Sequence, residues 1–188
     1  GALYIKKGAK FKPVTHGGHQ EKNIRPGTEN VAAIVAFGKA VEILTDEHGD
    51  EVTRVLGLRD RLYEGLKKSV PDIHPNGDES QRIYNTLNLS FDGLDGETLL
   101  MNMDLKHIYT STGSECAAGS LEVSHVLIAM GLNKKQARAT IRFSLGRFTT
   151  KEEIDYALRE IPAIIERLKR ASTSHAPTTS FTPPRQAR

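Results

Sequence analysis

The spacing of apolar residues changes along the chain, and this change limits the folds that the chain can form. Residues 30–47 and 52–66 carry apolar side chains at helical spacing, and Pro71 ends the second pattern. Residues 84–91 and 140–146 instead alternate apolar and polar side chains, which is typical of half-buried strands. Because helical and strand patterns alternate, the sequence predicts an α/β or α+β domain.

Shorter signals predict the remaining elements. Residues 2–8 and 108–111 are expected to form short strands. Further helices are predicted over residues 95–105, 121–132, 134–139 and 151–170. Asp95 is suited to cap the first of these helices, and Thr150 with Glu153 forms a capping box before the last one.

A loop rich in glycine and proline, residues 9–30, precedes the first long helix, whose expected N-cap is Asn30. This composition leaves little room for a helix within the loop. Its backbone N–H groups, one hydroxyl and one guanidinium could bind an anion, and the N-terminus of the following helix would strengthen that binding. These groups belong to Gly17, Gly18, Arg25, Gly27 and Thr28. The alternative interpretation is a plain turn.

The single cysteine, Cys116, lies in "STGSECAAGS", residues 111–120, among small and polar side chains. A free cysteine is usually buried and inert, but these neighbours cannot build an apolar shell around it. The alternative is a nucleophilic thiol on a mobile loop, where a nearby base or cation would have to favour the thiolate. Glu115 acts in the opposite direction. One cysteine also excludes an internal disulfide framework and fits a reducing compartment.

Arg142 lies in "TIRFSLG", where the alternation places Thr140, Arg142 and Ser144 on one face of a strand. An arginine at such a position is either a solvated, edge-protecting charge or a two-pronged clamp for a carboxylate. Lysine cannot reproduce the second role. The sequence leaves both interpretations open.

Several classes of partner are not expected. The formal net charge of +3 is small and the chain has no Trp, which argues against a nucleic-acid partner. His16 and His19 have no cysteine or carboxylate partner at a metal-ligand spacing, so no metal site is expected. Apolar runs stay well below the roughly 18 residues of a membrane span, and no signal peptide is recognised. We therefore expect a cytoplasmic protein with no membrane contact.

Five segments, in this order and at these intervals, resemble the cysteine desulfurases of the NifS/IscS type, which are class V aminotransferases. They are "GALYIKKG", "GGHQEKNIRPGTENV", "YNTLNLSFDGLDGETLL", "STGSECAAGSLEVSHVLIAMGL" and "IRFSLGRFTTKEEID". Together they cover nearly all of the chain up to about Arg170. The resemblance implies the C-terminal part of a pyridoxal-phosphate transferase of fold type I, lacking most of the large domain.

The same resemblance divides the chain into domains. Residues 1–30 correspond to the last strand and loop of the large domain, which binds the cofactor, and residues 31–70 to connecting helices. Residues 71–171 correspond to the small C-terminal domain, with the cysteine loop at 108–120. Residues 172–188 have no counterpart, are rich in Ser, Thr and Pro, and are predicted to be a disordered tail.

The resemblance also implies an activity, the conversion of L-cysteine to L-alanine with pyridoxal 5'-phosphate as cofactor. Sulfur would be carried as a persulfide on Cys116 and passed to an iron–sulfur scaffold or another sulfur acceptor. Arg142 would hold the α-carboxylate of the substrate. Thr28 would donate to the cofactor phosphate of the opposite subunit of a homodimer, in a loop shaped by Arg25 and Gln20.

Two departures from the family pattern bear on activity. Glu115 stands where the family usually has alanine, which disfavours the thiolate of Cys116. The family's Schiff-base lysine lies a few residues before the segment that matches residues 1–8, so it is expected on a missing or separate N-terminal portion. We therefore do not expect the chain to desulfurate cysteine alone. The alternative is a non-catalytic small-domain module or a sulfur-accepting interaction domain.

Overall fold

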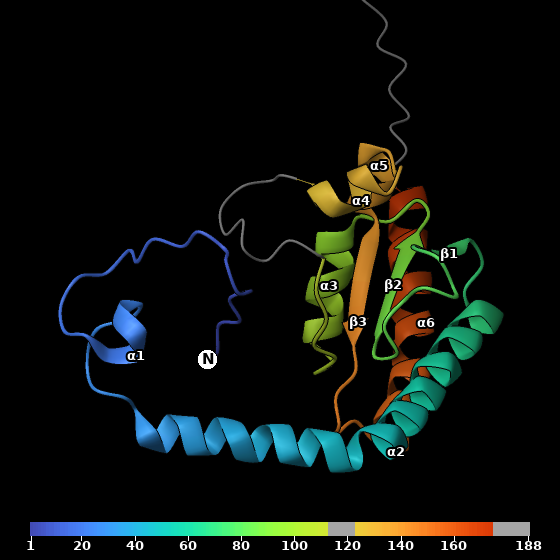
Figure 1. The fold of residues 1–188 in the computed structure, drawn as a ribbon. Coiled ribbons are helices and arrows are strands. Elements are labelled where there is room, and N and C mark those ends of the chain that lie inside the picture. Colours follow the sequence, from blue (N-terminus) through green and yellow to red (C-terminus); the bar gives the residue numbers. More distant parts are fainter. Residues whose placement is uncertain (113–122, 175–188) are drawn as a thin grey trace, which may run out of the picture. The chain divides into compact units, whose positions relative to one another are not determined.

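The computed structural model describes residues 1–112 and 123–174. The chain separates into two compact units, Gly1–Asp50 and Glu51–Arg188, which are described one at a time. The elements labelled in Figure 1 are α1 (Gln20–Asn23), α2 (Val31–Ser69), β1 (Ile73–Pro75), β2 (Thr86–Phe91), α3 (Gly96–Asp104), α4 (His125–Ala129), α5 (Lys134–Arg138), β3 (Thr140–Ser144) and α6 (Lys151–Ser174).

The two helices predicted over 30–47 and 52–66 are one helix, α2, which continues from the first unit into the second. The intervening residues contain Gly49 but no proline, and a glycine weakens a helix by about 1 kcal/mol without blocking its hydrogen bonds. The expected cap is confirmed, because the backbone N–H of Ala33 donates to Oδ1 of Asn30 at 3.0 Å.

The second unit contains an antiparallel sheet in the order β1-β2-β3. The strands predicted at 84–91 and 140–146 are confirmed as β2 and β3, and β1 is a short strand that the sequence patterns did not indicate. The strand predicted at 108–111 is reduced to one bridge, between Ser111 and Arg142.

The strand predicted at 2–8 is wrong, since these residues have no strand assignment. An isolated apolar stretch cannot form a strand, because the hydrogen bonds of a strand come from a neighbouring one. None of the described segments pairs with residues 2–8.

One face of the sheet is apolar and forms the core of the second unit. Leu87, Leu89 and Phe91 of β2 and Ile141 and Phe143 of β3 are buried. They pack with buried residues of α2, α3 and α6, among them Val55, Leu62, Leu66, Val70, Leu99, Met103, Ile154, Ala157, Ile161, Ile164 and Ile165. Figure 1 shows α6 lying along the sheet, with α3 beside β3.

The predicted helix starts in the second unit are confirmed by their hydrogen bonds. The N–H of Thr98 donates to Oδ2 of Asp95 at 2.8 Å, which caps α3. Before α6, the N–H of Thr150 donates to Oε2 of Glu153 at 2.8 Å, and the N–H of Glu153 donates to Oγ1 of Thr150 at 3.2 Å. This reciprocal pair is the predicted capping box. Where the sequence predicted a helix over 121–132, the described part shows the shorter α4.

The first unit has no buried side chain among its described residues. Its loop contains α1, a single turn in which Glu21, Lys22 and Asn23 have φ values of 48°, 57° and 66°, in the left-handed region. Each such residue costs about 1–2 kcal/mol. The prediction that 9–30 has little room for a regular helix is therefore confirmed.

Candidate functional site

Arg142 lies in the middle of β3, directly opposite Asn88 of β2. On its other side its backbone pairs with Ser111: the N–H of Arg142 donates to the carbonyl of Ser111 at 2.6 Å, and the N–H of Ser111 donates back at 3.1 Å. The sequence predicted Arg142 on a strand, which is confirmed. The structure adds that β3 also pairs with Ser111, which lies two positions before the segment 113–122.

The Arg142 side chain is half-buried, and its Nε is buried without a hydrogen-bond partner in the part of the chain that the structure describes. A buried donor left without an acceptor costs about 1–3 kcal/mol. Such an atom is rare in folded proteins and calls for an explanation. The guanidinium can donate from Nε and a terminal nitrogen together, which is the geometry that matches a carboxylate.

The face of the sheet that carries Arg142 is polar. It is built from Thr86, Asn88 and Ser90 of β2 and Thr140, Arg142 and Ser144 of β3, which alternate with the core residues. Thr140 is fully buried on this face, and its hydroxyl is satisfied because Oγ1 donates to the carbonyl of Ala137 at 2.9 Å. The alternation in the sequence predicted this face of β3, but it did not show that Asn88 stands opposite Arg142.

Cys116 lies outside the described residues, as does most of the loop 111–120 that was predicted to be mobile. Ser111 and Thr112 are described. Ser111 is buried, and Thr112 is half-buried. The buried Ser111 is held by its backbone bridge to Arg142, so the chain enters the cysteine segment from a fixed point on β3.

Thr28 lies in the first unit, at the end of the loop that precedes α2, and it is exposed. Arg25 donates from Nη1 to the carbonyl of Gly27 at 2.6 Å, and the N–H of Gly27 donates to Oε1 of Gln20 at 3.1 Å. Arg25 and Gln20 therefore brace the turn before Thr28. The N–H of Gly27 is already engaged, so the predicted anion-binding set loses one of its donors.

The left-handed turn of α1 is part of the same loop. His19 and Asn23 are joined through Nδ1 and Oδ1 at 2.7 Å, and the N–H of Asn23 donates to the carbonyl of His19 at 3.3 Å. These contacts hold the strained residues between them. This bracing could not be predicted from the sequence, because glycine and asparagine composition marks a turn without specifying its hydrogen bonds.

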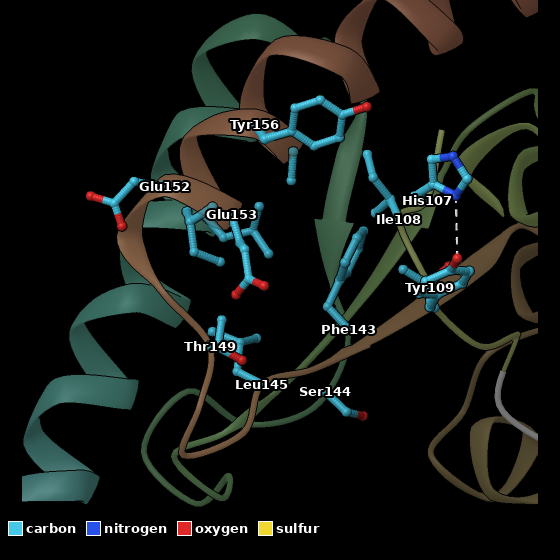
Figure 2. A pocket seen from close by; sticks show the side chains of 14 residues that line it. His107, Ile108, Tyr109, Phe143, Ser144, Leu145, Thr149, Glu152, Glu153 and Tyr156 are labelled. Carbon is cyan, nitrogen blue, oxygen red and sulfur yellow. Dashed lines mark hydrogen bonds between the residues drawn. The ribbon is translucent and has the colours of Figure 1, made fainter. Parts of the chain in front are cut away.

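A separate cavity of 560 Å³ opens between β3, the start of α6 and residues 107–110 (Figure 2). Its wall is mainly apolar, and Nδ1 of His107 lies 3.3 Å from the hydroxyl of Tyr109. Phe143 lines it from the face of β3 opposite to Arg142, and Leu145, the residue after the strand, also lines it. Of the candidate site residues that the structure describes, neither Arg142 nor Thr28 lines this cavity.

Within the described ranges, no group of three or more His, Cys, Asp or Glu side chains is placed to hold a metal ion. None of the described helices combines the length and the apolar character that a membrane span requires.

Residues 1–157 match the family model of class V aminotransferases. The chain belongs to the class V aminotransferase family. Within it, the chain is 45% identical over 172 residues to the cysteine desulfurase IscS of Dictyoglomus turgidum, covering 92% of this chain and 44% of the relative. It is 47% identical over 172 residues to the cysteine desulfurase IscS of Methanosarcina thermophila, covering 92% of this chain and 42% of the relative.

A solved structure described as a NifS-like protein superposes on the chain with a TM-score of 0.76 at 35% identity, covering 88% of this chain and 42% of that one. The predicted family and fold class, a partial class V aminotransferase fold, are confirmed. The chain spans less than half of the length of the curated relatives that it matches.

Proposed function

We propose that the chain is the C-terminal part of a pyridoxal-phosphate-dependent cysteine desulfurase, which takes sulfur from L-cysteine and leaves L-alanine. The observation that carries this proposal is the buried, unpaired Nε of Arg142 on the polar face of the sheet. A substrate that bears a carboxylate supplies the acceptor that this atom needs. Membership of the family and similarity to relatives named cysteine desulfurases support L-cysteine as that substrate.

In this proposal Arg142 binds the α-carboxylate of L-cysteine and fixes its orientation. The backbone of β3 at Arg142 is held on both sides, since β3 pairs with β2 on one side and with Ser111 on the other. A side chain on such a strand keeps its direction better than one on a loop. Orientation of this kind lowers the barrier by removing the entropy cost of aligning the reacting atoms.

Cys116 is the proposed sulfur acceptor. It follows Ser111 by five residues, so a fully extended chain can carry it at most about 18 Å from the bridge to Arg142. In the transfer, a sulfur–sulfur bond forms at Cys116, the Cβ–S bond of the substrate breaks, and Cβ takes up a proton. The substrate L-cysteine is thereby converted to L-alanine, which leaves, and Cys116 holds a persulfide.

The cofactor is held in this proposal with the help of Thr28, whose hydroxyl donates to the phosphate. The exposed position of Thr28 in a turn braced by Arg25 and Gln20 fits that role. When bound, pyridoxal phosphate acidifies the substrate Cα–H and weakens the Cβ–S bond. In this proposal the lysine that joins the cofactor, and its other ligands, belong to a further portion of protein. The chain's coverage of 42–44% of its relatives is compatible with such a portion.

The assembly that follows is a homodimer or a complex with a complementary N-terminal fragment, and the sulfur goes to an iron–sulfur scaffold or another acceptor in the cytoplasm. In the homodimer Thr28 acts on the cofactor of the opposite subunit. Residues 1–30 and 31–70 then belong to the large domain and its connection, and residues 71–171 to the small domain.

The test is to mix the chain with a polypeptide that covers the part of the relatives it does not match, and to measure alanine and sulfide formed from L-cysteine. We expect turnover only in the mixture. Cys116→Ala should abolish sulfide release while the mixture still binds pyridoxal phosphate. Arg142→Lys should raise the KM for L-cysteine on the order of tenfold, because a two-pronged contact is lost.

Undiminished sulfide release by the Cys116→Ala variant would remove Cys116 from the mechanism. A mixture that binds the cofactor but never forms alanine would favour the other candidate, a non-catalytic module. In that case Cys116 should still take up sulfur from an external persulfide donor.

A further inference from the structure

We propose that Asn88 is a positioning residue for Arg142. Its side-chain amide faces the guanidinium but carries no charge, and its hydrogen bond with Asn76 turns it away from Arg142. The Nε of Arg142 is thereby left for the carboxylate of a substrate. This inference rests on the proposed function for the identity of the carboxylate. The relation between the Asn88 and Arg142 side chains does not depend on that function.

The first step is the register of the sheet. Asn88 and Arg142 are directly opposite each other on β2 and β3, so both side chains stand on the same face. Side chains that face each other across an antiparallel pair have Cβ atoms about 4.5–5.5 Å apart. Asn88 therefore faces Arg142 from β2, as Ser111 does from the other side of β3.

The second step is that the acceptor of Asn88 is already engaged elsewhere. Its Oδ1 accepts from Nδ2 of Asn76 at 2.6 Å, and its backbone carbonyl accepts from the N–H of Asn76 at 2.9 Å. Asn76 is fixed in turn by the buried Ser90, whose Oγ accepts from the same Nδ2 at 2.9 Å. Among the described residues no hydrogen bond joins Asn88 to Arg142, and the contact with Asn76 directs Oδ1 of Asn88 toward the β1 side of β2, away from β3.

The third step concerns charge. Other arginines of the second unit contact carboxylates: Arg59 lies 2.6 Å from Asp60, Arg61 lies 2.5 Å from Asp155, and Arg147 lies 3.9 Å from Glu51. In the described part of the chain no carboxylate forms an ion pair with Arg142. Facing positions 86, 88 and 90 of β2 hold Thr, Asn and Ser, so this face of the strand is neutral.

An isosteric change makes the proposal testable. Asn88→Asp has the same size but places a carboxylate opposite Arg142, where it would pair with the guanidinium and compete with the substrate. Hydrogen bonds between charged groups are stronger than those of neutral pairs. We expect the affinity for a carboxylate ligand to fall on the order of tenfold or more.

The experiment uses the full chain labelled with ¹⁵N-arginine, and follows the Nε–H signal of Arg142, assigned by its loss in Arg142→Lys. Without ligand, Asn88→Asp should shift this signal and slow its exchange with water several-fold. The matched control is Asn102→Asp, because Oδ1 of Asn102 accepts from Nη2 of Arg167 at 2.6 Å. That change should alter the Arg167 signal and leave Arg142 as it is.

A second variant leaves the facing residue intact. Asn76→Ala frees Oδ1 of Asn88, which can then turn to Nε of Arg142, so exchange at Nε should again slow. If Asn88→Asp and Asn76→Ala both leave the shift and exchange of Arg142 unchanged while both variants keep their fold, the positioning role is overturned.

The ligand arm adds L-alanine, with L-alaninol, which lacks the carboxylate, as its control. In the wild-type chain L-alanine should shift the Nε signal and L-alaninol should not; in Asn88→Asp neither should. If the wild-type signal ignores L-alanine although Asn88→Asp captures Arg142, the positioning role stands and the proposed substrate contact fails. The two conclusions therefore fail separately.

Discussion

The two parts of helix α2 share one pattern and differ in their surroundings. In the second unit Val55 and Leu66 are 0% exposed, whereas in the first unit Ile34 is 52% and Leu44 55% exposed. The apolar spacing is helical in both parts. In the second unit the sheet and α6 cover the apolar stripe, and in the first unit none of the described segments buries it.

This difference shows what helical periodicity establishes. It shows which side chains share a face, but other segments decide whether that face is removed from water. Burial of apolar surface is worth about 25 cal/mol per Å². We therefore expect the second unit to contribute most of the cooperative unfolding free energy, and the first unit to rest mainly on local hydrogen bonds.

Truncating one apolar side chain in each part gives the largest expected contrast. Leu66→Ala should lower the unfolding free energy by about 2–5 kcal/mol, because it leaves a cavity between α2, the sheet and α6. Val41→Ala, on the exposed stripe, should change it by less than about 0.5 kcal/mol. Urea denaturation followed by circular dichroism measures both; equal losses would contradict the comparison.

Replacing one glycine in each unit by alanine should change stability in opposite directions. A Cβ at Gly96 would lie 2.5 Å from the carbonyl oxygen of Arg138 and 3.0 Å from that of Thr140, so Gly96→Ala should cost about 1–3 kcal/mol. A Cβ at Gly38, inside α2 of the first unit, would meet nothing within 4 Å. Gly38→Ala should therefore stabilise the helix by about 0.5–1 kcal/mol.

The measurements differ because the two glycines lie in different units. Global urea unfolding reports Gly96→Ala, and hydrogen exchange of the amides around residue 38 reports Gly38→Ala. A loss of protection around residue 38 in Gly38→Ala would show that this helix face is covered after all.

The smallest expected effect depends on pH. The Lys106 ammonium, 3.1 Å from Glu160, and then the Arg159 guanidinium hold the pKa of the Glu160 carboxyl below its usual value of 4.5. A lowered folded pKa stabilises the fold above the usual value, and this stabilisation is lost as pH falls through the lowered pKa. Glu160→Gln should thus be less stable than wild type at neutral pH and equal to it in acid.

Unfolding midpoints in urea at the two pH values check this prediction. The control is Glu42→Gln in the first unit, where the partner Lys39 lies 2.8 Å away on the surface. That change should leave the global midpoint unchanged at both pH values. A difference for Glu160→Gln that persists in acid would assign its effect to packing instead of charge.

Elements with a local signal could be predicted from the sequence. The capping residues Asp95, Thr150 and Glu153 act on N–H groups three residues away, so their patterns were sufficient. The strand predicted at 2–8 failed because strand formation depends on a distant partner. For the same reason the pairing of Arg142 with Asn88 could not be predicted: 54 positions separate them in the chain, and register is set by the whole sheet.

For the candidate site, the sequence identified Arg142 as a possible clamp because alternation placed it on a polar face. It could not show that Nε is buried and unpaired, since burial and pairing depend on segments that are distant in the chain. Thr28 was indicated by the composition of its loop, but its bracing by Gln20 depends on a contact across seven residues. The roles of Thr28, Arg142 and Cys116 remain predictions.

The bridge between Arg142 and Ser111 consists of main-chain bonds alone, and main-chain bonds do not depend on which side chain a residue carries. Mutation can replace either residue and keep both hydrogen bonds, except that proline at position 111 or 142 would remove the N–H donor of that residue. A mutation that removes the Arg142 guanidinium therefore does not by itself break the bridge between Ser111 and β3. A descendant of this chain could lose the proposed carboxylate contact and still keep Ser111 tied to β3.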